Sequence, residues 1–304
     1  MPAPRTIIVG DVHGMLVELE ALLSAVELTK DDVLVFLGDL IDKGPDSAGV
    51  VKYVNDLRKQ GYNVVLVLGN HEDKFARFRL AYERGGEKAI SKMKDSTALL
   101  ALLSALWDAD LALLDSAVPY AVVPGGIAVH GGILPSLETL PTMDEYAAMS
   151  KGEREKFHRI LRLRHVTGKA TAKVTVEYDL VGFQREDEER WFAGTTIPDE
   201  IVTRSQIIKE QVRPKGSFIT LGNEGPDDPF WANVYDGRFG HVYFGHSPYP
   251  DNVVPEQFPY ATGVDLGAVF GGRLCAAIVE EGVEGHSFVS LEASGKFATS
   301  FWEE

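Results

Sequence analysis

Four short polar stretches of this sequence contain residue types that bind metal ions. Asp11 and His13 lie in the first stretch, Asp39 in the second, Asn70 in the third and His130 in the fourth. Carboxylate, imidazole and amide oxygen together suit divalent metal ions of the hard-to-borderline class. The residue types therefore predict a metal site assembled from distant parts of the chain.

Each stretch follows a short apolar run, rich in β-branched residues, that is typical of a buried β-strand. Helical periodicity over residues 15–27 and around residues 50–57 separates the first three runs, and this alternation predicts right-handed parallel units. In open α/β sheets, ligands bind at the carboxyl ends of the strands. The expected strands are Thr6–Val9, Val33–Leu37, Val64–Leu68 and Ile127–Val129.

A single Gly-Asp-x-His-Gly turn also has an ordinary structural interpretation. The Asp would cap the following helix, and the His would lie on the surface. One such turn does not distinguish the two interpretations. Four strand ends with complementary ligand types in one chain favour the metal site.

The order and rough spacing of five motifs resemble those of the calcineurin-like metallophosphoesterases, and within them the phosphoprotein-phosphatase-like branch. The resemblance implies an α/β metallophosphoesterase fold, a β-sandwich of two mixed sheets flanked by helices, with a helical insertion after the third strand. We expect a single domain over residues 1–304, with the insertion at about 74–116. The motifs are Gly10–Gly14, Gly38–Gly44, Gly69–Glu72, His130–Gly132 and Gly245-His246.

The resemblance implies two divalent metal ions. Manganese is the expected metal, although the same ligand types accept Fe, Zn, Co or Ni. An N-cap is an alternative role for Asn70, and a loop position without a ligand role is an alternative for His246. The implied ligands are Asp11 and His13 for the first ion, Asp39 as the bridge, and Asn70, His130 and His246 for the second.

His71 directly follows Asn70, and we expect it to be the general acid that protonates the leaving oxygen. An imidazolium in this role needs a carboxylate that orients it and raises its pKa. The resemblance makes Asp42 that carboxylate. Turn chemistry before Gly44 is the alternative explanation for Asp42.

Phosphate oxygens also need cationic partners. Where the family has an arginine after the second Asp, this chain has Lys43, a point charge in place of a bidentate fork. Arg162 and Arg164 resemble an Arg-x-Arg segment of the diadenosine tetraphosphatase branch, and a solvated helix face is the alternative. Arg77 and Arg273 are weaker candidates.

Composition argues against several classes of function. The 304 residues are 45% hydrophobic and 25% charged, as in ordinary globular proteins. A formal charge of −15 argues against nucleic-acid partners and against docking on anionic membranes. The single cysteine, Cys275, cannot form an internal disulfide. The first strand begins too early for a signal peptide, so we expect a cytoplasmic protein.

The expected function is therefore a dinuclear-metal phosphohydrolase in which water attacks a phosphoric anhydride directly and in line. The stretches at 43–47 and 263–274 resemble the diadenosine tetraphosphatase branch, which implies symmetrical cleavage of diadenosine tetraphosphate into two ADP. The expected partner is a dinucleoside polyphosphate or another phosphate-bearing small molecule. Asp42 and Glu72 resemble the protein phosphatases instead, so a serine/threonine protein phosphatase is one alternative. Hydrolysis of polyphosphate by the same site is another.

Overall fold

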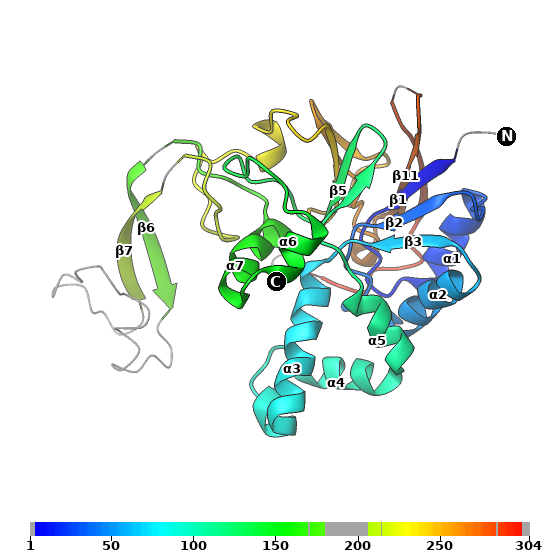
Figure 1. Ribbon diagram of the computed structural model, residues 1–304. Coiled ribbons are helices and arrows are strands. Elements are labelled where there is room, and N and C mark those ends of the chain that lie inside the picture. Colours follow the sequence, from blue (N-terminus) through cyan, green and yellow to red (C-terminus); the bar gives the residue numbers. More distant parts are fainter. Residues whose placement is uncertain (1–3, 170, 180–205, 214, 284, 300–304) are drawn as a thin grey trace.

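The computed structural model describes residues 4–169, 171–179, 206–213, 215–283 and 285–299 (Figure 1). Its first sheet has the strand order β12-β11-β1-β2-β3. Strands β1, β2 and β3 run parallel, as the strand–helix alternation predicted, whereas β11 is antiparallel to both of its neighbours. The strands are β1 (Arg5–Val9), β2 (Val33–Phe36), β3 (Asn63–Leu66), β11 (Arg273–Glu280) and β12 (Ser287–Glu292).

The second sheet has the order β4-β5-β8-β10-β9. Its three central strands are parallel, and each edge strand is antiparallel to its neighbour. Both sheets are thus mixed, which confirms the predicted fold. The strands are β4 (Ala121–Val123), β5 (Gly126–Val129), β8 (His241–Phe244), β9 (Glu256–Phe258) and β10 (Ala261–Gly263).

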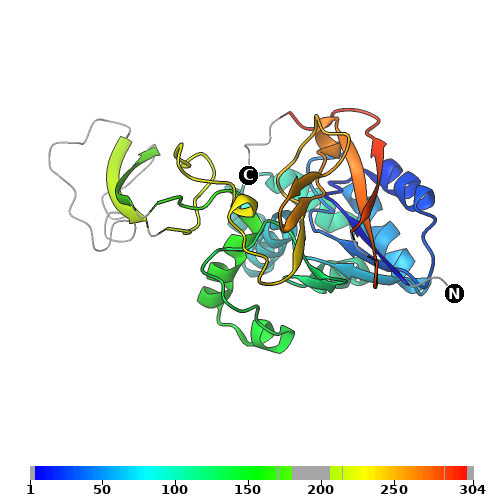
Figure 2. The ribbon, with the colours of Figure 1, turned by 90° about the horizontal axis from the view of Figure 1, so that it is seen from above.

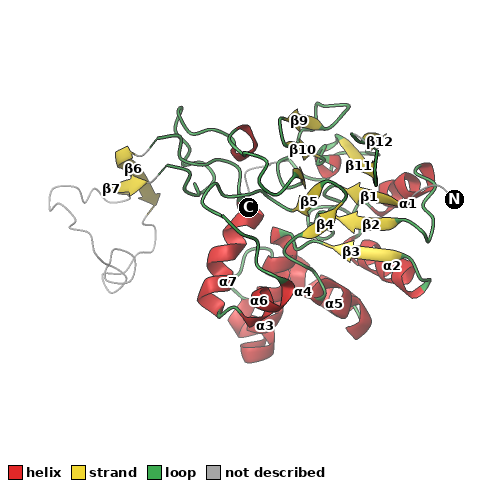
Figure 3. Cartoon of the chain, turned by 45° about the horizontal axis from the view of Figure 1, so that its top comes forward, coloured by secondary structure: helices red, strands yellow, loops and turns green. Residues whose placement is uncertain are grey.

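Alternate residues of the first sheet face two different layers, because successive side chains of a strand point to opposite faces. In β1, Ile7 and Val9 belong to the hydrophobic cluster under the helices, whereas Ile8 belongs to the cluster between the sheets. Helices α1 (Leu16–Ala25) and α2 (Ser47–Lys59) cover the outer face (Figure 3). The result is a helix–sheet–sheet sandwich.

Three helices lie between β3 and β4, namely α3 (Asn70–Ile90), α4 (Ser96–Ala105) and α5 (Asp108–Asp115). Gly86 has φ 59° and ψ −153° and breaks the helical geometry inside α3. Buried Phe75 and Leu99 join the same cluster as α1 and α2. The insertion thus covers the sheet face, while the N-terminus of α3 comes from the loop after β3.

No single helix of the described chain combines the length and apolarity that crossing a membrane requires. Helices α4 and α5 have the required length and apolarity only when they are taken together, and the pair is bent by 117° at the break between them.

Between β5 and β8, stretches without helix or strand connect the elements that the structure describes. Trp231, fully buried in η3 (Trp231–Asn233), packs on the outer face of that sheet. Strands β6 (Thr171–Asp179) and β7 (Gln206–Arg213) form an antiparallel pair that projects away from both sheets (Figures 1 and 2). The remaining elements are α6 (Met143–Ala148), α7 (Lys151–Phe157), η1 (His158–Arg162) and η4 (Ala268–Phe270).

Candidate metal centre and active site

The loops after β1, β2, β3, β5 and β8 meet at one place, where both sheets present the carboxyl ends of their parallel strands. The structure brings all six expected metal ligands together here. Every one of them is buried, with at most 4% of its surface exposed. These residues are Asp11, His13, Asp39, Asn70, His130 and His246.

Asp39 is the centre of this arrangement, because it belongs to two groups of potential ligands. One group is His13, Asp39 and His71, and the other is Asp39, His130 and His246. Within each group the ligand atoms lie within 4.8 Å of one another. The Oδ2 atom of Asp39 is 3.6 Å from Nε2 of His13 and 3.4 Å from Nε2 of His130. A carboxylate shared in this way can serve two cations at once.

In two of the imidazoles, a hydrogen bond to a backbone carbonyl determines which ring nitrogen is free to bind a metal ion. Nδ1 of His13 is 2.9 Å from the carbonyl oxygen of Ile41, and Nδ1 of His130 is 2.7 Å from that of Leu37. A carbonyl oxygen only accepts, so each Nδ1 carries the proton and donates it. The Nε2 lone pairs therefore face Asp39, ready to bind a metal ion.

Asn70 and Asp11 complete the set in different ways. Oδ1 of Asn70 lies 2.9 Å from Nε2 of His130 and 2.9 Å from Nδ1 of His246, so this amide oxygen belongs with the second group. The carboxylate of Asp11 accepts the backbone N–H of His246 at 3.0 Å and 3.2 Å. Asp11 thus positions the His246 loop, and it also lines the cavity that contains His13 and Asp39.

The donor set fits divalent cations on electrostatic grounds. Burial raises the pKa of Asp11, and the neighbouring charges of Asp265 and Asp39 raise it further. Burial likewise raises the pKa of Asp265, to about 6. Several buried carboxylates this close together are costly unless cations compensate them. Two divalent ions that share Asp39 would supply that compensation.

Sharp turns at the strand ends make this convergence possible. Five non-glycine residues of the site have positive φ, a conformation that non-glycine residues rarely adopt. Gly69 cannot carry a side chain, because an added Cβ would lie 2.2 Å from Oδ1 of Asp39. The positive-φ residues are His13 (45°), Asp39 (50°), Asp42 (73°), Lys43 (65°) and His246 (63°).

Glu72 holds the Asp39 loop, a role that the motif alone did not reveal. Its carboxylate accepts the backbone N–H groups of Asp39 at 2.7 Å, of Leu40 at 2.9 Å and of Gly69 at 3.2 Å. Burial raises the pKa of Glu72 to about 7, and the charge of Asp39 contributes in the same direction. Its position as the third residue of α3, a capping position, was the available sequence signal.

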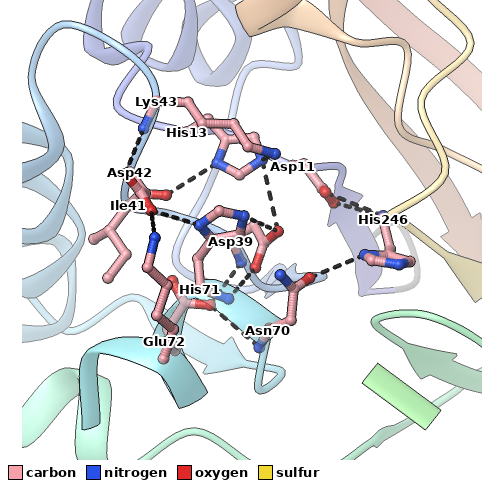
Figure 4. Close-up of polar contacts among 12 residues, drawn as sticks. Asp11, His13, Asp39, Ile41, Asp42, Lys43, Asn70, His71, Glu72 and His246 are labelled. Atoms are coloured by element: carbon pink, nitrogen blue, oxygen red, sulfur yellow. Dashed lines mark hydrogen bonds and ion pairs between the residues drawn. The ribbon is translucent and has the colours of Figure 1, made fainter. Parts of the chain in front are cut away.

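The His71 imidazole lies between two carboxylates, as Figure 4 shows. Nδ1 of His71 is 2.8 Å from Oδ2 of Asp42, and Nε2 is 3.8 Å from Oδ2 of Asp39. The Nε2 atom is buried and has no hydrogen-bond partner among the described residues. One end of the ring is therefore fixed, and the other end faces the metal ligands.

Lys74 also binds Asp42, and sequence reasoning missed it. Its Nζ lies 2.8 Å from the same Oδ2 atom and 2.5 Å from Oδ2 of Asp95, the residue before α4. Burial opposes ionisation of Asp42, yet hydrogen bonds and charge from His71 and Lys74 hold the pKa of its carboxyl well below the ordinary range. The signal in the sequence was the three-residue spacing from His71, which places both side chains on one side of α3.

The cationic residues expected to bind phosphate lie in different places. Lys43 and Arg164 line the cavity of the metal ligands, where Nη2 of Arg164 donates to the carbonyl oxygen of His246 at 2.9 Å. Arg162 does not line this cavity; its Nη2 donates to the backbone oxygen of Asn70 at 3.3 Å. Arg273, a predicted phosphate-binding residue, lines neither this cavity nor the cleft beyond His71, and its guanidinium donates to Ser290 of the neighbouring strand β12.

A cleft of about 660 Å³ opens directly beyond Asn70 and His71. Its walls come from α3, from the connection to α4, from η1 with the residues before it, and from the segment around Phe218. The cleft places solvent-accessible space on the His71 side of the metal ligands. Five cationic residues line it, namely Lys74, Arg77, Lys94, Arg159 and Arg162.

With this geometry established, comparison with known proteins identifies the family. Residues 4–250 match the model of the calcineurin-like phosphoesterases. The chain belongs to this family. It is accordingly a metal-dependent phosphoesterase, and its buried His and Asp groups are consistent with the dinuclear site that is typical of such enzymes.

Relatives with named activities match only part of the chain. The symmetrical bis(5'-nucleosyl)-tetraphosphatase of Pectobacterium atrosepticum is 50% identical over 68 residues, and that of Salmonella paratyphi B is 52% identical over 68 residues. Each match covers 22% of this chain and 23% of the relative. The chain thus aligns with less than a quarter of the length of these relatives.

Solved structures support the fold over nearly the whole chain. A protein provisionally named a diadenosine tetraphosphatase has a TM-score of 0.55 at 23% identity, with 97% of each chain covered. A serine/threonine phosphatase from Saccharomyces cerevisiae, similar to human PP5, has a TM-score of 0.50 at 15% identity, with 97% of this chain and 82% of that chain covered. At these identities the likeness concerns the fold alone.

The shared position of Asp39 generates a prediction about metal binding. In wild-type protein stripped with a chelator, added Mn²⁺ should raise the melting temperature by several degrees, because only the folded state binds it. Asp39→Asn should lose most of this rise, whereas Asp11→Asn should retain part of it. Thermal unfolding with and without Mn²⁺ measures both effects.

Asp56→Asn is the matched control, since Asp56 is an exposed acid that pairs with Lys59 on α2. Its rise should equal that of the wild type. A full wild-type rise in Asp39→Asn would contradict the shared-ligand arrangement.

Proposed function

We propose that this protein hydrolyses a phosphoric anhydride, and that its substrate is a dinucleoside polyphosphate. Diadenosine tetraphosphate would be split symmetrically into two ADP. One observation carries the proposal: His71, fixed by Asp42 and Lys74, lies between the metal ligands and a cleft lined by five cationic residues. Partial identity to the named tetraphosphatases adds support.

The metal ligands divide between two ions in this proposal. Asp11, His13 and Asp39 would hold one ion, and Asp39, Asn70, His130 and His246 would hold the other, with manganese as the proposed metal. Such ions polarise a phosphoryl oxygen and lower the pKa of a water molecule bound to them, which makes a nucleophile available at neutral pH. Lys43 and Arg164, which line the same cavity, would bind oxygens of the reacting phosphate through charge-assisted contacts.

His71 would act as the general acid. Water attacks phosphorus and forms the new P–O bond, while the bond from phosphorus to the bridging oxygen breaks and leaves its electron pair on that oxygen. The bridging oxygen takes the proton from Nε2 of His71, and the proton lost by water recharges the imidazole through solvent. Asp42, bound to Nδ1, keeps the ring in the orientation that this transfer requires.

Direct attack by water is favoured over a covalent route through cysteine. Cys275 lies in the core between the two sheets with 1% of its surface exposed. Burial raises the pKa of its thiol to about 12, so a thiolate nucleophile is unfavourable there. A single buried cysteine also needs no oxidising compartment, and a cytoplasmic location is part of the proposal.

Product analysis tests the symmetrical cut. With Mn²⁺ and diadenosine tetraphosphate in ¹⁸O-labelled water, the first turnovers should yield ADP alone, with the label in one of the two ADP molecules. Chromatography with mass detection measures this. AMP and ATP among the first products would refute symmetrical cleavage.

Rival substrates serve as comparisons in the same assay. Efficient turnover of a phosphopeptide without cleavage of diadenosine tetraphosphate would indicate a protein phosphatase. Turnover of inorganic polyphosphate alone would indicate a polyphosphatase.

Lys74 provides a test of the general-acid arrangement. Lys74→Met removes the cation beside Oδ2 of Asp42 and leaves this oxygen bound to His71, while Oδ1 keeps the backbone N–H of Lys43. The imidazole should therefore be held less firmly in the orientation that proton transfer requires. We expect kcat to fall about tenfold for an alkyl phosphate, which needs a proton on its leaving oxygen, and by less than about twofold for 4-nitrophenyl phosphate. Steady-state kinetics on the two substrates measures the difference.

Lys74→Arg should restore most of the lost rate, since it keeps a cation beside Asp42. Lys59→Met is the matched control. Lys59 also pairs with an aspartate, Asp56, but it lies on α2 and lines neither the ligand cavity nor the cleft. Equal losses on the good and the poor leaving group would show that Lys74 acts on overall structure instead.

A further inference from the structure

The cleft beyond His71 has a charge opposite to that of the chain as a whole. The protein has a formal charge of −15, yet among the residues that the structure describes, the cleft is lined by five cationic side chains and two acidic ones, Asp73 and Glu155. Lys74 is engaged with Asp42 and Asp95. The three arginines line the walls from both sides, Arg77 on α3 and Arg159 and Arg162 on η1.

Asp73 organises these cations without neutralising them. Its Oδ1 atom is 2.9 Å from Nδ1 of His158, and its Oδ2 atom is 3.2 Å from Nη2 of Arg77 and 3.4 Å from Nη2 of Arg162. One carboxylate thus meets two guanidinium groups, each of which has five N–H donors. Arg77 is 58% exposed and Arg162 is 33% exposed, so donors of both remain accessible from the cleft.

The position of His71 decides which part of a substrate enters this cleft. A phosphorus atom bound among the metal ligands has its leaving oxygen on the side of the general acid, and His71 lines the cleft. Arg162 connects the two places, since its Nη2 donates to the backbone oxygen of Asn70 at 3.3 Å. The leaving group therefore extends from the ligand cavity into the cationic cleft.

The charge of the cleft distinguishes classes of leaving group. The alcohol released from a phosphoserine or phosphothreonine carries no negative charge and would leave these guanidiniums without a partner. The diphosphate of a nucleotide carries several negative charges and matches them through charge-assisted, bidentate contacts. Met93 and Phe218, both half-buried, add an apolar wall to the same cleft, against which a base could stack.

We propose that this cleft is the binding site for a nucleoside diphosphate leaving group, with Arg77, Arg159 and Arg162 contacting its phosphates. The inference rests on the proposed function only for the place of the reacting phosphate. The choice of an anionic leaving group follows from the residues of the cleft itself.

Binding of ADP to chelator-treated protein tests the proposal apart from catalysis. Because the cleft lies outside the ligand cavity, wild-type protein without metal should bind ADP in calorimetry at low salt. Arg77→Met and Arg159→Met should each weaken this binding about tenfold, the usual effect of losing one hydrogen bond to a charged group. Adenosine, which lacks the phosphates, should bind far more weakly than ADP.

Arg84→Met is the matched control. Arg84 lies seven residues after Arg77 on α3, which is about two helical turns away. It is exposed and does not line the cleft. Its ADP affinity should equal that of the wild type. Unchanged ADP affinity in Arg77→Met and Arg159→Met would overturn the proposal, and equal affinity for pyrophosphate and ADP would overturn its nucleoside part.

Kinetics separate this proposal from the proposed function. With Mn²⁺, Arg77→Met and Arg159→Met should raise KM for diadenosine tetraphosphate about tenfold and leave 4-nitrophenyl phosphate turnover within about twofold. Equal losses on both substrates would overturn the cleft site while the hydrolase assignment stands. Tight, arginine-dependent ADP binding in an enzyme that does not cleave diadenosine tetraphosphate would support the cleft and contradict the proposed substrate.

Discussion

The carboxylate of Asp39, shared between two groups of buried ligands, is the interaction on which the rest of the structure depends. It is held from three sides, because Glu72 binds its backbone N–H, the N–H of His71 donates to its Oδ1 at 3.0 Å, and imidazoles surround its Oδ2. This geometry requires positive φ angles at several residues, and it requires a glycine at position 69.

The two-sheet sandwich supplies the residues that surround Asp39. Asp39 follows a strand of the first sheet, whereas His130 and His246 follow parallel strands of the second. Packing between the sheets, with Ile8 and Val35 among the buried residues, fixes the distance between the two sources of ligands. Interiors are close-packed, so the spacing of the ligands is set by the core and not by the loops alone.

The strand ends and the meeting of the candidate ligands there were predictable from sequence, because each motif is local and its residue types are chemically specific. The cationic residues were not, since their places depend on irregular structure. Arg162 ends a 3-10 helix and lines the cleft, whereas Arg164, two residues later and after an extended Leu163, lines the ligand cavity. Lys74 has the sequence context of an ordinary helix residue. Arg273 pairs with Ser290 of the following strand β12, a contact that the motif around it does not indicate.

The central claim is that one carboxylate holds two metal ions side by side. Electron paramagnetic resonance of wild-type protein loaded with two equivalents of Mn²⁺ tests it directly, because ions about 3.5–4 Å apart couple magnetically. We expect the multiline spectrum of a coupled pair, and we expect Asp39→Asn to abolish it. Isolated six-line Mn²⁺ signals at full loading of the wild type would contradict the shared-ligand arrangement.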